Sequence, residues 1–400
     1  MVPVAEVYKA GRLAAELRRI AGGTEFRYRA EYLASEAPPV ASTLPRSADP
    51  LVTPAGAVPA FFAGLLPEGR RLSALRRSVK TSADDELSLL TAVGADTIGD
   101  VQVVPAGERP PSDVSALALP GNAAEVRFAE LLRRSGIAAR PSLAGVQDKA
   151  SAAMLSLPVR HRAERFILKL DPPEFQHLVQ NEAYFADLSR SSGMPTATAR
   201  IITDADGQSG LLVGRFDRMP RDGTIRMIAV EDAAQAAGLW PADKYNVSFE
   251  QAAAALAALT AAPVVAAARL LEQLAFAWLT GNGDQHAKNL SVYEAEPGEF
   301  RVTPAYDLPS TVFYGDETLA LTVEGRDTLT ARRFAGAADA LGVPRRAARR
   351  ILNAALRSTH DLADRIETDA LPFDHRVNAK AARTLRRRHA ELAEGLGSLG

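Results

Sequence analysis

The sequence predicts an α+β fold with two lobes, in which a mixed α/β N-terminal part precedes an all-helical C-terminal lobe. Short runs of alternating apolar and polar residues, which are typical of β-strands, are concentrated before residue 230. From there on the chain is rich in Ala and Leu at helical spacing, as in residues 249–260 and 264–279. One polar loop, residues 281–289, interrupts this helical half, and the functional interpretation depends on it.

The composition is that of an ordinary globular protein. Its 400 residues are 47% hydrophobic and 24% charged, which allows two or three cores and does not favour disorder. The 47 Lys and Arg nearly balance the 48 Asp and Glu, so the overall charge does not favour nucleic acid or an anionic membrane as the main partner. The lack of Cys excludes a disulfide scaffold, a thiolate zinc site and a Cys nucleophile, and it fits a reducing cytoplasm. Because there is no signal peptide and no apolar run near about 18 residues, we expect a soluble cytoplasmic protein that does not enter a membrane.

The polar loop carries a spacing typical of phosphoryl transfer. Asp284 and Asn289 are spaced D-x4-N, which suits a carboxylate that orients a substrate hydroxyl and an amide oxygen that binds Mg²⁺. Asp307 follows one short hairpin later and could hold the same metal. The alternative is that Gly-Asn-Gly-Asp is only a turn, since turns select these residues.

Residues 1–110 are expected to form a small α+β module. The expected strands span residues 2–8, 12–18, 24–32 and 100–104, and the expected helices span residues 59–70 and 84–93. The polar, Pro-rich segment 106–113 then predicts a domain boundary.

Residues 111–230 are expected to form the sheet of the first lobe. The expected elements are helices at 123–135 and 178–190 and strands at 165–170, 199–203 and 210–218. Lys169 interrupts the apolar strand 165–170, and such a lysine usually extends its ammonium group to solvent. Glu182 in the following helix could pair with it, as the Lys and helix Glu of a kinase do, or could be a solvated acid favoured by the helix dipole.

The end of strand 210–218 is a candidate hinge. Backbone groups of Gly214, Arg215 and Phe216 could meet an adenine there. An ordinary strand end with a surface Arg-Asp pair is the alternative.

Residues 231–400 are expected to form the helical lobe. The expected helices span residues 231–237, 249–260, 264–279 and 330 to the end, with one short strand at 319–323. The last part is locally basic, with arginines at 345–346, 349–350 and 386–388. Such arginines usually form a solvated helix face, which we favour over contact with nucleic acid or an acidic partner.

The order of these features is that of a protein-kinase-like fold, although the H-R-D and D-F-G motifs of eukaryotic kinases are absent. Together the local motifs resemble those of the HipA family of bacterial serine/threonine kinases, the toxins of type II toxin-antitoxin pairs. The matching motifs are Ser142–Lys149, Ile167–Leu170, Gln180–Glu182, Arg215–Arg218, Gly283–Ser291 and Thr303–Asp307. Two further segments, Leu65–Pro67 and Val93–Gly99, are similar to the family's N-terminal module, so the resemblance extends over nearly the whole chain.

The resemblance implies a role for each matching residue. Asp284 would be the catalytic aspartate, Asn289 and Asp307 would bind Mg²⁺, and Glu182 would be the partner of Lys169. The residues implied to bind ATP are Ala144, Gly145, Val146, Gln147, Asp148, Lys149, Lys169, Gly214, Arg215, Phe216, His286, Lys288 and Tyr306. Ser142 matches a serine that is autophosphorylated in the family, which would expel the loop, because a phosphate cannot remain packed beside ATP.

The resemblance also implies partners. The acceptor would be a protein hydroxyl, and characterised relatives act on aminoacyl-tRNA synthetases. A HipB-like helix-turn-helix antitoxin would bind the kinase, which would meet operator DNA only in that complex. Two positions depart from the family: Gln285 stands where Gly is frequent, and Gly214 stands where an acidic residue is common. These departures concern substrate preference and nucleotide affinity more than catalysis.

Two other functions remain open. Gly283-Asp284-x-His286-x-x-Asn289 also resembles the loop of phosphatidylinositol kinases, and D-x4-N recurs in aminoglycoside phosphotransferases. A lipid kinase should have a basic or apolar membrane-facing loop, but residues 309–317 are not basic. A catalytically silent co-repressor that acts beside its antitoxin is the other alternative, and it would have no need to retain Lys169, Asp284, Asn289 and Asp307.

Overall fold

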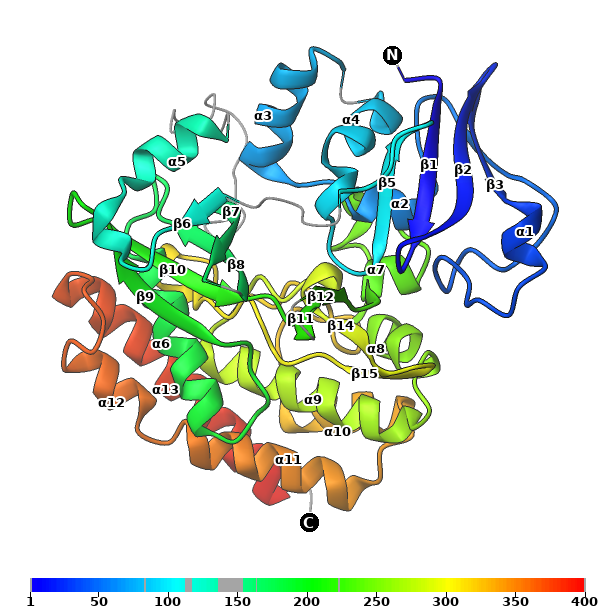
Figure 1. Cartoon of the computed structure of the whole chain (residues 1–400). Helices are drawn as coiled ribbons and strands as arrows, with labels where there is room; N and C mark the ends of the chain where they lie inside the picture. Colours follow the sequence, from blue (N-terminus) through cyan, green and yellow to red (C-terminus); the bar gives the residue numbers. More distant parts are fainter. Residues whose placement is uncertain are drawn as a thin grey trace.

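The structure of the protein is a computed structural model that describes residues 2–82, 84–111, 117–135, 154–162, 164–221 and 224–398. Four sheets and a group of C-terminal helices make up the described part (Figure 1). Within the described residues, no helix is both long enough and apolar enough to cross a membrane.

The N-terminal module is built on an antiparallel sheet with the strand order β4-β3-β2-β1-β5 (Figure 1). Its strands are β1 (Val4–Lys9), β2 (Arg12–Ile20), β3 (Gly23–Tyr28), β4 (Leu51–Pro54) and β5 (Val101–Pro105). Its helices are α1 (Ala30–Leu33), α2 (Ala60–Gly64), α3 (Gly69–Val79) and α4 (Glu86–Val93), followed by the 3₁₀ turn η1 (Gly94–Asp96). Alternate side chains of β1 are buried, because Val7 packs with Leu17, Phe26 and Phe62 in one core.

The second sheet has the order β6-β7-β8-β10-β9, in which only the pair β6 and β7 is parallel. Its strands are β6 (Leu117–Leu119), β7 (Leu155–His161), β8 (Glu164–Leu170), β9 (Ala199–Thr203) and β10 (Ser209–Gly214). The helical elements of this region are η2 (Ala123–Glu125), α5 (Phe128–Arg134) and α6 (Leu178–Ser191). Along β8, Phe166 and Leu168 enter a core with Phe128, and the alternation of the strand turns Ile167 and Lys169 to the opposite face.

The C-terminal part is mainly helical. Its strands are the hairpin β11 (Arg218–Arg221) and β12 (Thr224–Met227) and the sheet β13 (Val230–Asp232), β14 (Ser291–Glu296) and β15 (Glu299–Val302). Its helices are α7 (Ala233–Ala236), α8 (Phe249–Ala258), α9 (Pro263–Thr280), α10 (Ala331–Ala340), α11 (Arg345–Ser358), α12 (Leu362–Glu367) and α13 (His375–Ser398). Three 3₁₀ turns are η4 (Pro241–Asp243), η5 (Ala287–Asn289) and η6 (Thr311–Tyr314). Leu271 and Trp278 of α9 pack with Leu256 of α8 and Leu352 of α11 in one core.

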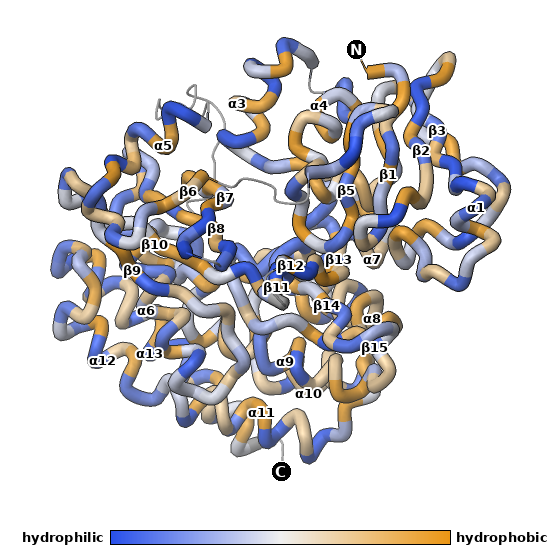
Figure 2. The backbone as a smooth tube through the Cα atoms, viewed as in Figure 1, coloured by the Kyte–Doolittle hydropathy of each residue, from blue (hydrophilic) through white to orange (hydrophobic). Residues whose placement is uncertain are grey.

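The tail arginines do not all lie on a solvated face. Figure 2 shows hydrophilic and hydrophobic residues alternating along α11, and Arg345, Arg346 and Arg349 are exposed there as predicted. Arg388 of α13 is instead buried: its guanidinium group lies over the Trp278 ring at 4.0 Å and donates to the Trp278 carbonyl oxygen at 2.9 Å.

Several predicted elements were wrong in extent. Residues 59–70 do not form one helix, because Pro67 disfavours helical backbone at Leu66, and the chain breaks between α2 and α3. The predicted strand 24–32 ends at Tyr28, and the predicted strand 210–218 ends at Gly214. The predicted strand 319–323 is absent: alternate side chains there are buried, but pairing is limited to isolated bridges. The strands β4, β6, β7, β11, β12 and β13 were missed.

Candidate active site

The polar loop is fixed by the end of α9 and by close packing. The helix ends at Thr280, and the left-handed backbone of the following Gly281 (φ +76°) lets the chain turn away sharply. A Cβ atom at Gly283 would lie 2.6 Å from Thr311 Oγ1, so a side chain does not fit there. The Gly283 amide donates to that same oxygen at 2.9 Å, which ties the loop to η6.

Asp284 is buried, and its carboxylate is held in place. Its backbone amide donates to Asn282 Oδ1 at 2.9 Å. Its Oδ1 accepts a hydrogen bond from the Tyr245 hydroxyl, also at 2.9 Å. These contacts orient the carboxylate that was predicted to be catalytic.

Asn289 lies one turn further along the same loop. Its Nδ2 donates to the Asp284 carbonyl oxygen at 2.8 Å, so the two predicted functional residues are coupled directly. Because the nitrogen is used in this bond, Oδ1 is the atom of the side chain that remains to bind a cation.

Asp307 reaches the site from the segment that follows β14 and β15. Its backbone is left-handed (φ +57°), which is strained for a residue with a side chain. Asn282 Nδ2 donates to the Asp307 carbonyl oxygen at 3.2 Å and so links this residue to the polar loop. Strain of this kind is found most often where function requires it.

Lys169 bridges two carboxylates. Its Nζ lies 2.7 Å from Glu182 Oε1 and 2.7 Å from Asp307 Oδ1, so the lysine does not extend to bulk solvent. Burial alone would lower the pKa of Lys169, but attraction to Asp307 and Glu182 outweighs it and raises this pKa. Burial raises the pKa of Glu182 to about 7, even though Lys169 opposes this shift.

These side chains line one cavity of about 420 Å³ between the second sheet and the C-terminal part. Every predicted site residue within the described ranges lines it except Glu182, which lies behind Lys169. The predicted residues that line it are Lys169, Gly214, Arg215, Phe216, Asp284, His286, Lys288, Asn289, Tyr306 and Asp307. Ser142 and the predicted phosphate loop, Ala144–Lys149, lie outside the described residues.

The candidate hinge differs from a surface strand end. The amides of Gly214 and Arg215 donate to the carbonyl oxygens of Thr198 and Arg165, at 2.8 and 3.0 Å, so these two N–H groups are already used within the protein. Phe216 lies against the Tyr306 ring, with ring centroids 5.7 Å apart, and both rings line the cavity. A planar ligand would therefore meet an aromatic wall here.

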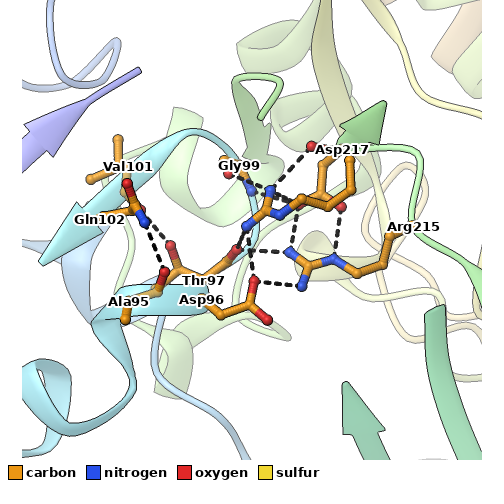
Figure 3. A network of polar contacts seen from close by, with 9 residues as sticks. Ala95, Asp96, Thr97, Gly99, Val101, Gln102, Arg215 and Asp217 are labelled. Carbon is orange, nitrogen blue, oxygen red and sulfur yellow. Dashed lines mark hydrogen bonds and ion pairs between the residues drawn. The ribbon is translucent and has the colours of Figure 1, made fainter. Parts of the chain in front are cut away.

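The Arg215 side chain belongs to a buried network, shown in Figure 3. Arg215 and Arg218 both pair with Asp217, at 2.8 Å each, and both pair with Asp96, at 2.8 and 3.0 Å. Each also donates to the Thr97 carbonyl oxygen. The motifs Arg215–Arg218 and Val93–Gly99 therefore meet, and they join the N-terminal module to the hinge.

His286 and Lys288 take different positions. His286 Nδ1 is buried and has no hydrogen-bond partner in the described part of the chain. Burial lowers the pKa of His286, despite the opposing attraction of Asp284, so its ring is neutral at pH 7. Lys288 is directed at the N-terminal module instead, where its Nζ donates to the Gly64 carbonyl oxygen at 3.0 Å.

Sequence reasoning missed several residues of the cavity. These are Glu68 and Arg71 of the N-terminal module, and Lys244, which precedes Tyr245. Glu68 follows Leu65–Pro67, a segment already singled out, so that motif was an available signal. No pattern in the sequence connected it with a loop more than two hundred residues away.

The fold and the cavity define a class of protein. A sheet and a helical lobe that enclose Lys169, Asp284, Asn289 and Asp307 form the two-lobed fold of protein-kinase-like enzymes. The sequence matches the HipA-like C-terminal domain over residues 141–363 and the HipA N-terminal domain over residues 5–104. The chain belongs to the HipA family of kinases.

Individual relatives agree with this membership. A Sinorhizobium fredii protein named "Putative kinase Y4mE" is 31% identical over 314 residues, which are 73% of each chain. The "Serine/threonine-protein kinase toxin HipA" of Shewanella oneidensis is 29% identical over 71% of each chain. A solved complex of Shewanella oneidensis HipA with HipB and operator DNA contains a chain that matches this fold with a TM-score of 0.79, at 23% identity over 99% of both chains.

The donor set fits a magnesium nucleotide. Asp307 and Asn289 offer the hard oxygen atoms that Mg²⁺ prefers, and Lys169 offers a cation for phosphate. A ligand in the cavity could satisfy His286 Nδ1. Among the described residues, no group of three or more His, Cys, Asp or Glu side chains could hold a metal by itself. A cation at this site would therefore need further ligands such as phosphate oxygens.

Proposed function

We propose that the protein transfers the γ-phosphoryl group of ATP, with Mg²⁺, to a serine or threonine hydroxyl of a protein. The observation that carries this proposal is the convergence of Lys169, Asp284, Asn289 and Asp307 on one cavity. These residues come from a strand, from the loop after α9 and from the segment after β15. A scaffold that only binds a partner would not need this combination of a cation, a base and two oxygen ligands.

Each residue has a chemical role in this proposal. Lys169 contacts ATP phosphates and is kept charged and oriented by Glu182. Asn289 and Asp307 hold Mg²⁺, which neutralises phosphate charge when bound. Asp284 orients the acceptor hydroxyl and takes its proton. A bond forms between the acceptor oxygen and the γ-phosphorus while the bond to the β–γ bridging oxygen breaks, and ADP leaves.

The nucleotide base would lie at the hinge. Phe216 and Tyr306 supply an aromatic wall for adenine, and the neutral His286 ring offers Nδ1 as a hydrogen-bonding group. The predicted phosphate loop, Ala144–Lys149, would cover the phosphates, and Ser142 would be the site of autophosphorylation.

We further propose that the protein is the toxin of a type II toxin-antitoxin pair and acts in the cytoplasm. A relative over 71% of the chain is named a serine/threonine-protein kinase toxin, and the matching solved structure contains HipA with HipB and operator DNA. The expected partner is thus a HipB-like helix-turn-helix antitoxin, through which the kinase would meet operator DNA. An aminoacyl-tRNA synthetase is the proposed protein substrate.

The experiment that tests the transfer reaction offers γ-labelled ATP and Mg²⁺ together with separate pools of proteins, lipids and aminoglycosides. Label in the protein pool, absent with the Asp284→Ala variant, is the expected result. Label confined to the lipid or the aminoglycoside pool would show that the acceptor is not a protein. No transfer by the wild-type protein to any pool or to itself would favour a silent co-repressor and would overturn the proposal.

A second experiment tests the proposed autophosphorylation. After incubation with Mg²⁺ and ATP, a phosphopeptide map is expected to contain phosphorylated Ser142. A map in which the protein is phosphorylated elsewhere while Ser142 is unmodified would contradict this part of the proposal.

A further inference from the structure

Glu68 brings a carboxylate from the N-terminal module into the cavity. It precedes α3 at the N-cap position, but its side chain makes no capping hydrogen bond to that helix. Its Oε1 lies 2.8 Å from Lys288 Nζ, and its Oε2 forms an ion pair with Lys244. One side chain of the N-terminal module therefore contacts two cations of the C-terminal part.

Each of these lysines is adjacent to a proposed functional group. Lys288 immediately precedes Asn289 in the polar loop. Lys244 immediately precedes Tyr245, whose hydroxyl donates to Asp284 Oδ1 at 2.9 Å. The Ala287 amide donates to the Lys244 carbonyl oxygen at 3.1 Å, so the two lysine-bearing segments are also joined through the backbone.

The two lysines require an anion between them. Their side chains are only 11% and 13% exposed, so mutual repulsion is poorly screened by water. Burial alone would raise the pKa of Glu68, but attraction to Lys288 and Lys244 outweighs it and lowers this pKa to about 2. The carboxylate is therefore ionised at neutral pH and can hold both cations.

We propose that Glu68 is a positioning residue for the catalytic loop: by holding Lys244 and Lys288 together, it fixes the orientation of Asp284 and Asn289. The N-terminal module is then part of the phosphoryl-transfer site and not only an attached domain. This inference rests on the proposed function. It gives Glu68 no contact with the transferred group, so its effect should fall on the rate of transfer and not on nucleotide binding.

The test uses the full chain and the variant Glu68→Gln, which keeps the size of the side chain and removes its charge. The matched control is Glu174→Gln. Glu174 lies outside the N-terminal module and pairs with Arg70 of that module at 2.7 Å, whereas Lys244 and Lys288 pair with Glu68. Both variants thus remove an ion-paired carboxylate between the N-terminal module and the rest of the chain. Glu174→Gln removes the pair with Arg70, whereas Glu68→Gln removes the pairs with Lys244 and Lys288.

We expect Glu68→Gln to lower kcat by at least about ten-fold, because small displacements of catalytic groups reduce rates strongly. The KM for ATP should stay within about two-fold of the wild-type value, and Glu174→Gln should change neither constant. An unchanged kcat in Glu68→Gln would overturn the inference. A change in KM alone would also overturn it, since Glu68 would then only screen the lysines from nucleotide. An equal loss of kcat in Glu174→Gln would assign the effect to general docking of the module.

Amide hydrogen exchange of residues 281–291 provides a readout that does not require activity. Exchange in this loop is expected to be faster in Glu68→Gln than in the wild-type protein or Glu174→Gln, with an intermediate rate in Glu68→Asp, which keeps the charge on a shorter side chain. Should the wild-type protein transfer no phosphate, the proposed function fails, and this comparison still decides whether Glu68 orders the loop. Equal exchange in all four proteins would exclude positioning by Glu68.

Discussion

Two charge networks border the same cavity, and they differ in how completely the protein encloses and neutralises them. In the first, the side chains of Arg215, Asp217 and Arg218 are only 3–5% exposed, and two arginines face two aspartates, Asp96 and Asp217. In the second, one lysine, Lys169, faces two carboxylates, and one of these, Asp307, is 30% exposed. The first network is closed and has as many arginines as aspartates, whereas the second is open and has two carboxyl groups around one lysine.

The difference in exposure indicates a structural role for the closed network and a ligand-binding role for the open network. A ligand cannot enter the closed network without breaking ion pairs that are shielded from water, so this network is suited to holding the N-terminal module against the hinge. The open network could exchange partners when a cation and phosphates arrive, and its ionised Asp307 carboxylate would favour Mg²⁺. Two features of the open network are unfavourable for folding. Burial raises the pKa of Glu182 to about 7, and the backbone of Asp307 is strained.

The largest expected effect is on the rate of phosphoryl transfer and comes from a change at Asp284, which lies beside the open network. Asp284→Ala should lower the rate of phosphoryl transfer by about a thousandfold, because it removes the proposed base. Nucleotide affinity should change little, since Asp284 is proposed to act on the acceptor hydroxyl, and the melting temperature should fall only modestly through loss of the hydrogen bond from Tyr245. Labelled-ATP transfer, nucleotide titration and thermal denaturation measure the three quantities, and a variant with undiminished turnover would remove this assignment.

The closed network should behave in the opposite way. Asp217→Asn leaves Arg215 and Arg218 with one carboxylate between them and should lower the free energy of unfolding by about 3 kcal/mol, as measured in urea. The transfer rate per folded molecule should change far less than in Asp284→Ala. The control Glu299→Gln removes an exposed ion pair with Arg301 and should cost less than about 1 kcal/mol. Equal decreases in the free energy of unfolding in both variants would show that the closed network stabilises the protein no more than an exposed ion pair does.

A smaller effect concerns the pH dependence of stability. Burial alone would raise the pKa of Asp217, but attraction to Arg215 and Arg218 lowers it below its ordinary value. A lowered pKa gives stability that is fully present above the unfolded-state pKa of about 3.9 and is lost as pH falls further. The difference in unfolding free energy between wild type and Asp217→Asn should therefore be constant from about pH 5 to 7 and shrink below about pH 4. A difference that grows on acidification would reverse the assigned direction of the pKa shift.

The sequence predicted the contacts between residues that are close together in the chain, and it did not predict the contacts between distant residues. Asp284 and Asn289 are close in sequence, and Asp307 follows one hairpin later, so local spacing was enough to place them together. The Lys169 strand and the Glu182 helix were also predicted, because strand alternation and helical spacing are local patterns.

Long-range partners could not be predicted in this way. The pairing of Asp96 with Arg215, or of Glu68 with Lys244, depends on how the N-terminal module docks, and no spacing encodes that arrangement. For the segment 319–323, a local pattern led to a wrong prediction. Its alternation reflects the burial of Leu319, Leu321 and Val323 and not a strand, because pairing requires a neighbour that the sequence pattern cannot reveal.

Whether the open network binds the magnesium nucleotide is tested most directly by the affinity for ATP, measured with and without Mg²⁺ in the wild-type protein and in Asp307→Asn. Asn tolerates left-handed backbone, so this change removes the charge of the open network without adding strain. We expect Mg²⁺ to strengthen ATP binding by the wild-type protein, and we expect this effect of Mg²⁺ to be largely lost in the variant. An Asp307→Asn protein that keeps the full Mg²⁺ dependence would contradict the claim that the open network is the magnesium-nucleotide site.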